Sequence, residues 1–361
     1  MKTKGIHHIS SVAGHAQRSI DFNAGVLGYR LVKQTLNYDD KEMYHLYFGN
    51  REANSGLITT FPMNNSACGK VGGGQVAASI YAIRPDSINF WKNRLQSFGI
   101  DTTESIRFNQ KRLVFKDPEG LTMELVEQDK GPLNTWEFNG VKGQDTITGI
   151  ESALIYSRNP EKTLNLFTEV LGYSLADEDN DHYLLKVHDE LGGFLELAKK
   201  PSDRGLNGIG TVHHIAFAVG DNEIDNWKIK LEENAYRPTE VKDRKYFRSI
   251  YFREKGGLLI ELATKSPGMT VDEKLGDLGS SLIIPDDFKN ENHDDLMPLF
   301  VREVKELSGY GYRDRYEYEI LQAKHEIMNK IKEIKLKENL SEADKNKLEA
   351  LKKQYLNKGE S

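Results

Sequence analysis

An internal duplication restricts the possible folds of this chain more than any other property of its sequence. Residues 22–31, FNAGVLGYRL, return as FTEVLGYSL at residues 167–175. Residues 115–126, FKDPEGLTMELV, return as FREKGGLLIELA at residues 252–263. Repeated sequence units fold alike, so each copy of the first phrase should close a helix at a glycine, Gly28 or Gly172. Each copy of the second phrase should form a β-hairpin around a glycine turn.

The segments between these phrases complete the repeating unit. Each half adds a strand and a helix, at residues 77–83 and 87–98 and again at residues 213–219 and 223–234. The simplest arrangement is an α+β fold of four βαβββ modules, at residues 5–62, 75–128, 147–199 and 210–265. We expect two paired domains, residues 5–130 and 147–265, joined by a linker at residues 131–145.

The last hundred residues follow a different pattern. Residues 266–300 have loop composition with an apolar patch, LIIPDDF, and are expected to wrap back on the body. Residues 301–361 are rich in lysine and glutamate, with Ile320, Met328, Ile331 and Ile334 at helical spacing. This pattern predicts a charged helical tail, either solvated or bound to a partner. A break is expected near residues 339–341, with Ser341 as the N-cap of the next helix.

Composition narrows the class of protein. The 361 residues include one cysteine, Cys68, so an intrachain disulfide is excluded. The net charge is −6, the wrong sign for nucleic-acid binding over a whole surface, and no apolar run has the length of a membrane span. We therefore expect a cytoplasmic protein with a small-molecule partner.

Two matched histidine pairs mark the candidate site: Gly5-Ile6-His7-His8-Ile9-Ser10 and Thr211-Val212-His213-His214-Ile215-Ala216. Successive side chains of a strand face opposite sides, so one member of each pair should point into a shared cavity. His8 shares its face with Ser10, and His214 with Ala216, small residues that leave room for a ligand. This parity favours His8 and His214 as metal ligands and leaves His7 and His213 as supporting or packing residues, although a β-bulge would reverse a face.

Glu261 is the third candidate ligand. It lies in an apolar strand, where a carboxylate needs a counter-ion or a bound cation. Two imidazoles and one carboxylate form the facial triad of non-haem iron(II) oxygenases, a donor set that also suits manganese(II). Glu124 and Glu196 lie in similar strands without matched histidines, so we expect metal-free copies there and one metal per chain.

These motifs resemble those of a known group. The His-His-Ile strands, the VLGY elements and the glutamate-ending hairpins are similar to those of the vicinal-oxygen-chelate superfamily, which includes glyoxalases, extradiol dioxygenases and fosfomycin or bleomycin resistance proteins. Residues 243–252, DRKYFRSIYF, resemble a signature of hydroquinone-type ring-cleaving dioxygenases. So do NYDD at residues 37–40 and YHLYFG at residues 44–49. The resemblance covers about residues 5–300.

The resemblance implies a function and its residues. It implies metal ligation by His8, His214 and Glu261, with Arg244 and Tyr251 beside the substrate and Ser10 where threonine is common. The activity it implies is Fe(II)-dependent cleavage of a hydroquinone or catechol ring by O2, as in the detoxification of quinones and aromatics.

The roles of the neighbouring residues and the rival functions stay open. His7, His213 or Tyr251 would move the phenolic proton. We expect a homo-oligomer, and the tail is one candidate for its interface. The alternatives are a glyoxalase-type isomerase or lyase and a non-catalytic protein that sequesters a toxic small molecule. Oxygen consumption with a hydroquinone would separate the three.

Overall fold

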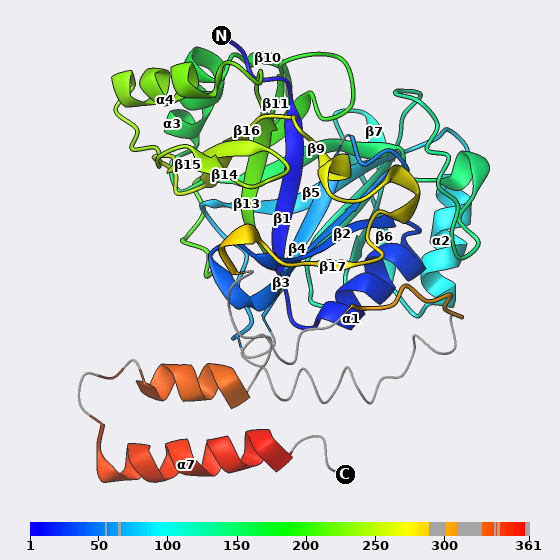
Figure 1. Ribbon diagram of the computed structural model, residues 1–361. Coiled ribbons are helices and arrows are strands. Elements are labelled where there is room, and N and C mark those ends of the chain that lie inside the picture. The colour runs from blue at the N-terminus through cyan, green and yellow to red at the C-terminus, as the bar shows by residue number, and fades with distance from the viewer. Residues whose placement is uncertain are drawn as a thin grey trace.

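The computed structural model describes residues 1–54, 56–63, 66–288, 301–308, 327–335, 337 and 340–357. Two curved β-sheets form the body, short helices pack along them, and a pair of helices stands at one end (Figure 1). The α+β class predicted from the repeats is therefore confirmed.

The first sheet contains nine of the described strands. In spatial order they are β14 (Lys242–Asp243), β15 (Arg248–Arg253), β16 (Leu259–Ala263), β13 (Thr211–Ala218), β1 (Ile6–Ala13), β4 (Leu57–Pro62), β3 (Asp40–Gly49), β2 (Arg30–Asn37) and β17 (Leu282–Ile283). The second sheet contains eight: β10 (Ser174–Glu178), β11 (His182–Lys186), β12 (Phe194–Ala198), β9 (Gly149–Tyr156), β5 (Gln75–Ile83), β8 (Thr122–Glu127), β7 (Gln110–Lys116) and β6 (Thr102–Arg107).

The sheets combine the modules differently from the predicted division of the chain. The first sheet joins the first and fourth modules through the antiparallel pair β1 and β13, and the second joins the second and third through β5 and β9. Within a module, the opening strand pairs with a neighbour along one edge only. When the opening strands of two modules pair with each other, the free edge of each is covered. The predicted domains, residues 5–130 and 147–265, therefore do not correspond to separate sheets, and their limits stay a prediction.

Four helices accompany the repeats. They are α1 (Ala16–Ile20), α2 (Ile88–Ser97), α3 (Pro160–Asn165) and α4 (Ile224–Glu233). The first and third continue as π-helical turns, Asp21–Val26 and Leu166–Val170. The chain leaves these turns at Gly28 and Gly172, whose φ angles of 71° and 87° favour glycine, as the repeated phrase predicts. Short 3-10 turns occur at Gly143–Asp145, Met269–Val271, Leu275–Asp277 and Asp286–Phe288.

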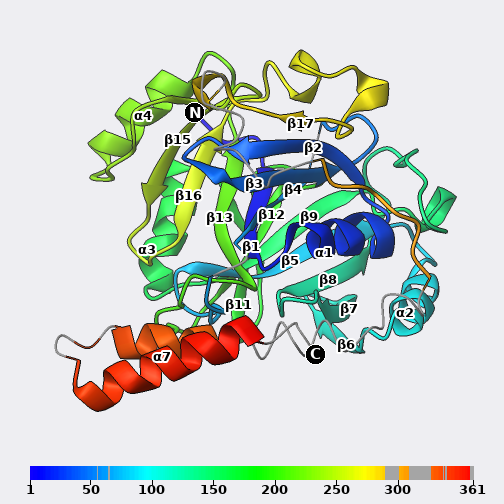
Figure 2. The same ribbon diagram turned by 60° about the horizontal axis from the view of Figure 1, so that its bottom comes forward.

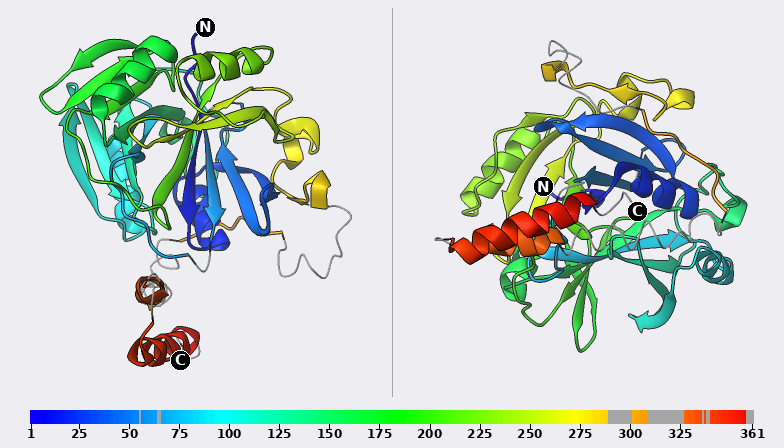
Figure 3. Two further views of the ribbon diagram at one scale, coloured as in Figure 1. Left: turned by 90° about the vertical axis from the view of Figure 1, so that its left-hand side faces the viewer. Right: turned by 90° about the horizontal axis from the view of Figure 1, so that it is seen from below.

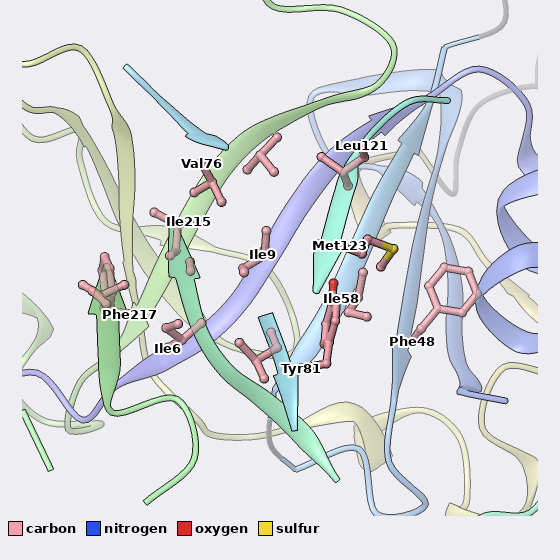
Figure 4. Close-up of a cluster of buried hydrophobic side chains, with 14 of the residues drawn as sticks. Ile6, Ile9, Phe48, Ile58, Val76, Tyr81, Leu121, Met123, Ile215 and Phe217 are labelled. Carbon is pink, nitrogen blue, oxygen red and sulfur yellow. The ribbon is translucent and has the colours of Figure 1, made fainter. Parts of the chain in front are cut away.

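The main core lies where the two sheets face each other. Figure 4 shows Ile9 and Ile215 of the first sheet beside Val76 and Tyr81 of the second, and all four are buried. Along β1, Ile9 points into this core while His8 and Ser10 belong to the opposite face. Packing of one face thus fixes the orientation of the polar face that carries the candidate site.

The described part of the segment after β16 packs against the body of the protein. Strand β17 pairs in parallel with β2, with Leu282 opposite Gln34. The buried Lys33 Nζ contacts Asp272 at 2.6 Å and Glu273 at 2.5 Å. A buried cation held by two carboxylates ties this segment to the sheet edge. Residues 289–300 lie outside the described residues.

The charged tail begins later than expected. Residues 301–308 are not helical and bind the body, since Arg302 N donates to Gln34 Oε1 at 2.9 Å and Leu307 N donates to Asn139 Oδ1 at 3.0 Å. Helical structure follows at residues 327–335 and in α7 (Glu342–Asn357). None of the described helices is long and apolar enough to cross a membrane.

The two tail helices pack against each other as a hairpin (Figures 2 and 3). Its buried contacts are made by Ile327, Ile331, Ile334 and Leu351. Ser341 is the predicted N-cap: its hydroxyl accepts from Asp344 N at 3.1 Å, and Asp344 Oδ2 accepts from Ser341 N at 3.2 Å. Ile320 lies outside the described residues.

Candidate metal centre

Three neighbouring strands bring the predicted ligands together. His8 comes from β1, His214 from β13 and Glu261 from β16, and all three side chains are buried. His8 Nε2 lies 3.2 Å from His214 Nε2 and 3.1 Å from Glu261 Oε2, and His214 Nε2 lies 2.9 Å from the same oxygen. Within the described ranges this is the one such cluster of histidine, cysteine and carboxylate ligands.

A β-bulge accompanies each histidine pair. Between β1 and β13 the register steps from Ile6 to His8 on one side, which leaves His7 as the extra residue. It steps from His214 to Val212 on the other side, which leaves His213 as the extra residue. Strict alternation would place these two rings on the far face of the sheet. The bulges turn both of them alongside the candidate ligands instead.

Contacts of the rings confirm this placement of the neighbours. His7 and His8 both lie against Phe247, with ring centroids 5.2 and 5.5 Å away. The His213 and His214 rings both face Phe61, at 5.5 and 6.2 Å. Each phenylalanine therefore packs against one of the two histidine pairs, and no role was predicted for either from the sequence.

The nitrogens of each candidate ligand have separate tasks. His8 and His214 direct Nε2 towards the cluster, while their Nδ1 atoms lie 2.8 Å from Nδ1 of His7 and His213 respectively. Burial, with the adjacent ring, lowers the pKa of His7 to about 3 and that of His213 to about 4. Burial also lowers the pKa of His214. Neutral rings with one nitrogen held by a neighbour are the state in which histidine binds metals.

Glu261 supplies the negative charge. Burial alone would raise its pKa, but His8 and His214 hold the pKa well below its usual range, so the carboxylate stays ionised. Within the described residues neither of its oxygens has a hydrogen bond of good geometry. Ligands at about 2.1 Å and right angles around one ion would be roughly 3.0 Å apart. The observed spacing of 2.9–3.2 Å and the two-imidazole, one-carboxylate set thus fit a divalent cation.

Arg244 and Tyr251 border the same cluster. Tyr251 lies opposite Glu261 on the neighbouring strand, and its ring centroid is 5.5 Å from that of His214. Burial and the Glu261 charge raise the pKa of Tyr251, so its phenol keeps the proton. The Arg244 guanidinium lies 5.7 Å from the Tyr251 ring centroid and is held by Asp39 Oδ2 at 2.7 Å.

Ser10 begins a chain of buried hydrogen bonds. Its Oγ lies 2.6 Å from Thr59 Oγ1, which lies 2.9 Å from His45 Nε2, and His45 Nδ1 lies 2.8 Å from the Tyr47 hydroxyl. No role was predicted for Thr59, His45 or Tyr47. His45 and Tyr47 were within the YHLYFG phrase, two residues apart and so on one face of a strand, which is a usable signal. Thr59 carried none.

The second sheet shows what replaces the metal site in the other half. Glu124 Oε2 contacts Arg112 Nη1 at 2.9 Å and Arg107 Nη2 at 2.7 Å, and Glu196 Oε1 contacts Arg112 Nη2 at 2.8 Å. Arg107 also contacts Glu196. Two guanidinium groups neutralise the glutamates that correspond to Glu261 in the repeat. This arrangement explains how these buried carboxylates are tolerated without a cation from solution.

The fold and this cluster define a class of protein. The sequence profile of the glyoxalase/bleomycin resistance protein/dioxygenase superfamily matches residues 5–125 and 149–262. The chain belongs to this superfamily, which is the vicinal-oxygen-chelate group that the motifs resemble.

Two relatives indicate which members of the superfamily this chain resembles. "Putative ring-cleaving dioxygenase MhqO" of Bacillus subtilis is 39% identical over 308 residues, which cover 84% of this chain and 99% of the relative. The chlorohydroquinone/hydroquinone 1,2-dioxygenase of Sphingobium indicum is 33% identical over 78% of this chain and 91% of its own. The chain therefore resembles ring-cleaving dioxygenases over most of its length.

Solved structures of other proteins share this fold. The crystal structure of a "putative dioxygenase" from Bacillus subtilis has a TM-score of 0.82 and 39% identity, covering 85% of this chain and 99% of that chain. Glyoxalase I of Zea mays has a TM-score of 0.54 at 13% identity, over 73% of this chain and 92% of that chain, and shares the fold alone.

Proposed function

We propose that this protein is an iron(II)-dependent dioxygenase that opens the ring of a hydroquinone or catechol, with manganese(II) as the alternative metal. The observation that carries the proposal is the buried cluster of His8, His214 and Glu261 on the face of the first sheet that points away from the main core. The hydroquinone dioxygenase among the relatives supports the substrate class. The homo-oligomer and the part played by each site residue belong to the proposal as well.

The metal would be held by three protein ligands. When bound there, iron(II) supplies the redox chemistry that joins a spin-paired aromatic diol to dioxygen, at coordination positions that the protein leaves open. Neutral His7 and His213 keep the ligand rings oriented through their Nδ1 contacts of 2.8 Å. The ligand geometry thus depends on four histidines, of which two face the metal.

The remaining side chains act on the organic substrate. Arg244, fixed by Asp39, presents a permanent positive charge to a phenolic oxygen that loses its proton. Tyr251 keeps its own proton and donates a hydrogen bond to an oxygen of the ring. The phenolic proton would be relayed through His7 or His213 and not held there, because burial keeps the pKa of both rings low. Phe61 and Phe247 flank the site and exclude water from it.

The test is oxygen uptake by anaerobically purified protein reloaded with iron(II) or manganese(II). We expect one O2 consumed for each molecule of 2-methylhydroquinone or catechol, with both atoms of ¹⁸O2 recovered in an acyclic product. His8→Ala under the same conditions is the control and should consume none. Isomerisation of a hemithioacetal without oxygen would instead identify a glyoxalase-type enzyme, and tight binding without turnover would identify a sequestering protein.

A further inference from the structure

A cavity of about 450 Å³ lies between the C-terminal hairpin and the metal-bearing sheet. The body contributes Val12, Met63, Ser66, Ala67, Asn207, Gly208 and His213. The hairpin contributes Met328, Ile331, Lys332 and Lys335. The hairpin stands beyond the end of β1 (Figures 1 and 3), so it faces the end of the sheet where this strand leaves the site.

This cavity adjoins the metal cluster. Val12 follows His8 and Ser10 on the face of β1 that points away from the main core, and it pairs with Phe61, which contacts the His214 ring. His213 contacts both the cavity and the metal cluster, because it lines the cavity and its Nδ1 lies 2.8 Å from Nδ1 of His214. A ring held at the metal would therefore direct a substituent past Phe61 and His213 into this space.

The side of the cavity formed by the hairpin carries apolar and positively charged side chains. Met328, Ile331, Lys332 and Lys335 are three or four residues apart and so share one helix face. Both lysines are exposed, and in the described part of the chain no carboxylate pairs with either of them. The lining residues include no acidic side chain. The cavity thus has apolar and neutral polar walls near the sheet and positive charge at its outer rim.

We propose that the C-terminal hairpin forms the outer wall of the substrate cavity and that Lys332 and Lys335 select aromatic diols with an anionic ring substituent. The proposal rests on the ring-cleaving function argued above. The superfamily profile ends at residue 262, so this determinant of specificity belongs to the part of the chain that lies beyond the shared fold. Two rim lysines facing one carboxylate would favour the anionic diol about threefold to thirtyfold, because exposed pairs each contribute little.

The test compares 2,5-dihydroxybenzoate with 2-methylhydroquinone on the full-length, iron-loaded protein. The Lys332→Gln/Lys335→Gln double variant should lose threefold to thirtyfold in kcat/KM for 2,5-dihydroxybenzoate while keeping the value for 2-methylhydroquinone. Lys330→Gln is the matched control, because this lysine is exposed on the same helix and does not line the cavity. It should leave both values unchanged. An equal effect of the double variant on both diols, or none on either, would overturn the proposal.

Binding separates this inference from the proposed reaction. Equilibrium dialysis of 2,5-dihydroxybenzoate against wild type and the double variant requires no turnover. If ring cleavage fails but binding is weaker in the double variant, the anion-selective cavity stands and the reaction does not. If ring cleavage succeeds while binding is the same in both proteins, the reaction stands and the role of the two lysines is wrong.

Discussion

Two imidazole nitrogens and one carboxylate oxygen, about 3 Å apart, are the atoms on which the proposed chemistry depends. We predict that His8→Ala, His214→Ala and Glu261→Ala each abolish retention of iron and turnover, because a site with three protein ligands cannot lose one. Metal content by mass spectrometry after gel filtration checks this, with circular dichroism to show that each variant is folded. Stoichiometric metal in any of the three would remove that residue from the ligand set.

His7 offers a test of the bulged strand. We predict that His7→Ala retains stoichiometric iron, since Nε2 of His8 is untouched, but binds it about tenfold more weakly, the usual cost of losing a partner of a ligand ring. Competition with a chelator measures the affinity. Complete loss of metal from His7→Ala, with retention in His8→Ala, would mean that the two neighbours exchange roles.

Arg244 and Tyr251 should affect rate and leave metal binding intact. Neither is a predicted ligand, yet both lie against the cluster and are fixed there by Asp39 and by the strand opposite Glu261. Arg244→Ala and Tyr251→Phe should keep one metal per chain and lower kcat by on the order of tenfold to a thousandfold. Steady-state oxygen uptake checks this. Wild-type kinetics in both variants would show that the two residues have only a structural role.

At this scale the sequence could predict the candidate ligands but not their surroundings. The duplicated His-His phrases and one carboxylate in an apolar strand suffice to select His8, His214 and Glu261. The chain from Ser10 through Thr59 to His45 depends on the register between separate strands, which no local pattern contains. The bulges at His7 and His213 were invisible for the same reason, because a bulge is a property of a strand pair.

Among the elements, the hairpin turn between β7 and β8 should make stability depend on pH. Asp117 is partly buried there, and its Oδ1 accepts from the backbone N–H of Glu119 and Leu121 at 2.9 and 2.8 Å. Burial and the Glu119 charge raise the pKa of Asp117 to about 7. The folded protein therefore holds a proton that the unfolded chain releases near pH 4, and the free energy of unfolding falls as pH rises from 4 to 7.

Asp117→Asn keeps the acceptor oxygen and removes this titration. We predict that its advantage over wild type grows by roughly 1–2 kcal/mol between pH 5 and pH 8, measured by urea unfolding. Asp221→Asn is the control. Hydrogen bonds from the Ser266 hydroxyl and from the backbone N–H groups of Lys265 and Ser266 outweigh burial there and hold the pKa of Asp221 below its ordinary value, so its difference from wild type should stay constant over this range. Parallel pH profiles of wild type and Asp117→Asn would contradict the prediction.

Helix ends and hairpins were easier to predict from the sequence than the pairing of distant strands. The repeated VLGY phrases correctly place a helix end at Gly28 and at Gly172, and the glutamate-ending phrases correctly place two hairpins, because helix caps and glycine turns are local. The pairing of β1 with β13 joins strands about two hundred residues apart. Four similar modules can pair in several ways, and the hydrophobic pattern of each opening strand is compatible with more than one of them.

For the whole molecule, we predict that the hairpin is dispensable for folding and metal binding. Ending the chain after residue 308 keeps the contacts of Arg302 and Leu307 with the body, which a cut after residue 300 would remove. The shortened protein should retain one metal and open 2-methylhydroquinone at a rate within about threefold of wild type, since all three ligands precede residue 262. Metal analysis and oxygen uptake check this, and light scattering shows whether the oligomeric mass changes. A metal-loaded but inactive product would place the hairpin in the catalytic machinery.

The pairing of the first module with the fourth has a consequence for biosynthesis. Strand β1 leaves the ribosome early, but its partner β13 follows about two hundred residues later, and the last ligand, Glu261, later still. In the interval the second sheet can assemble alone, while β1 keeps an open edge of the kind that invites aggregation. The metal centre thus closes only after Glu261 has been made, and a nascent chain that captures a metal has already brought its first and fourth modules together.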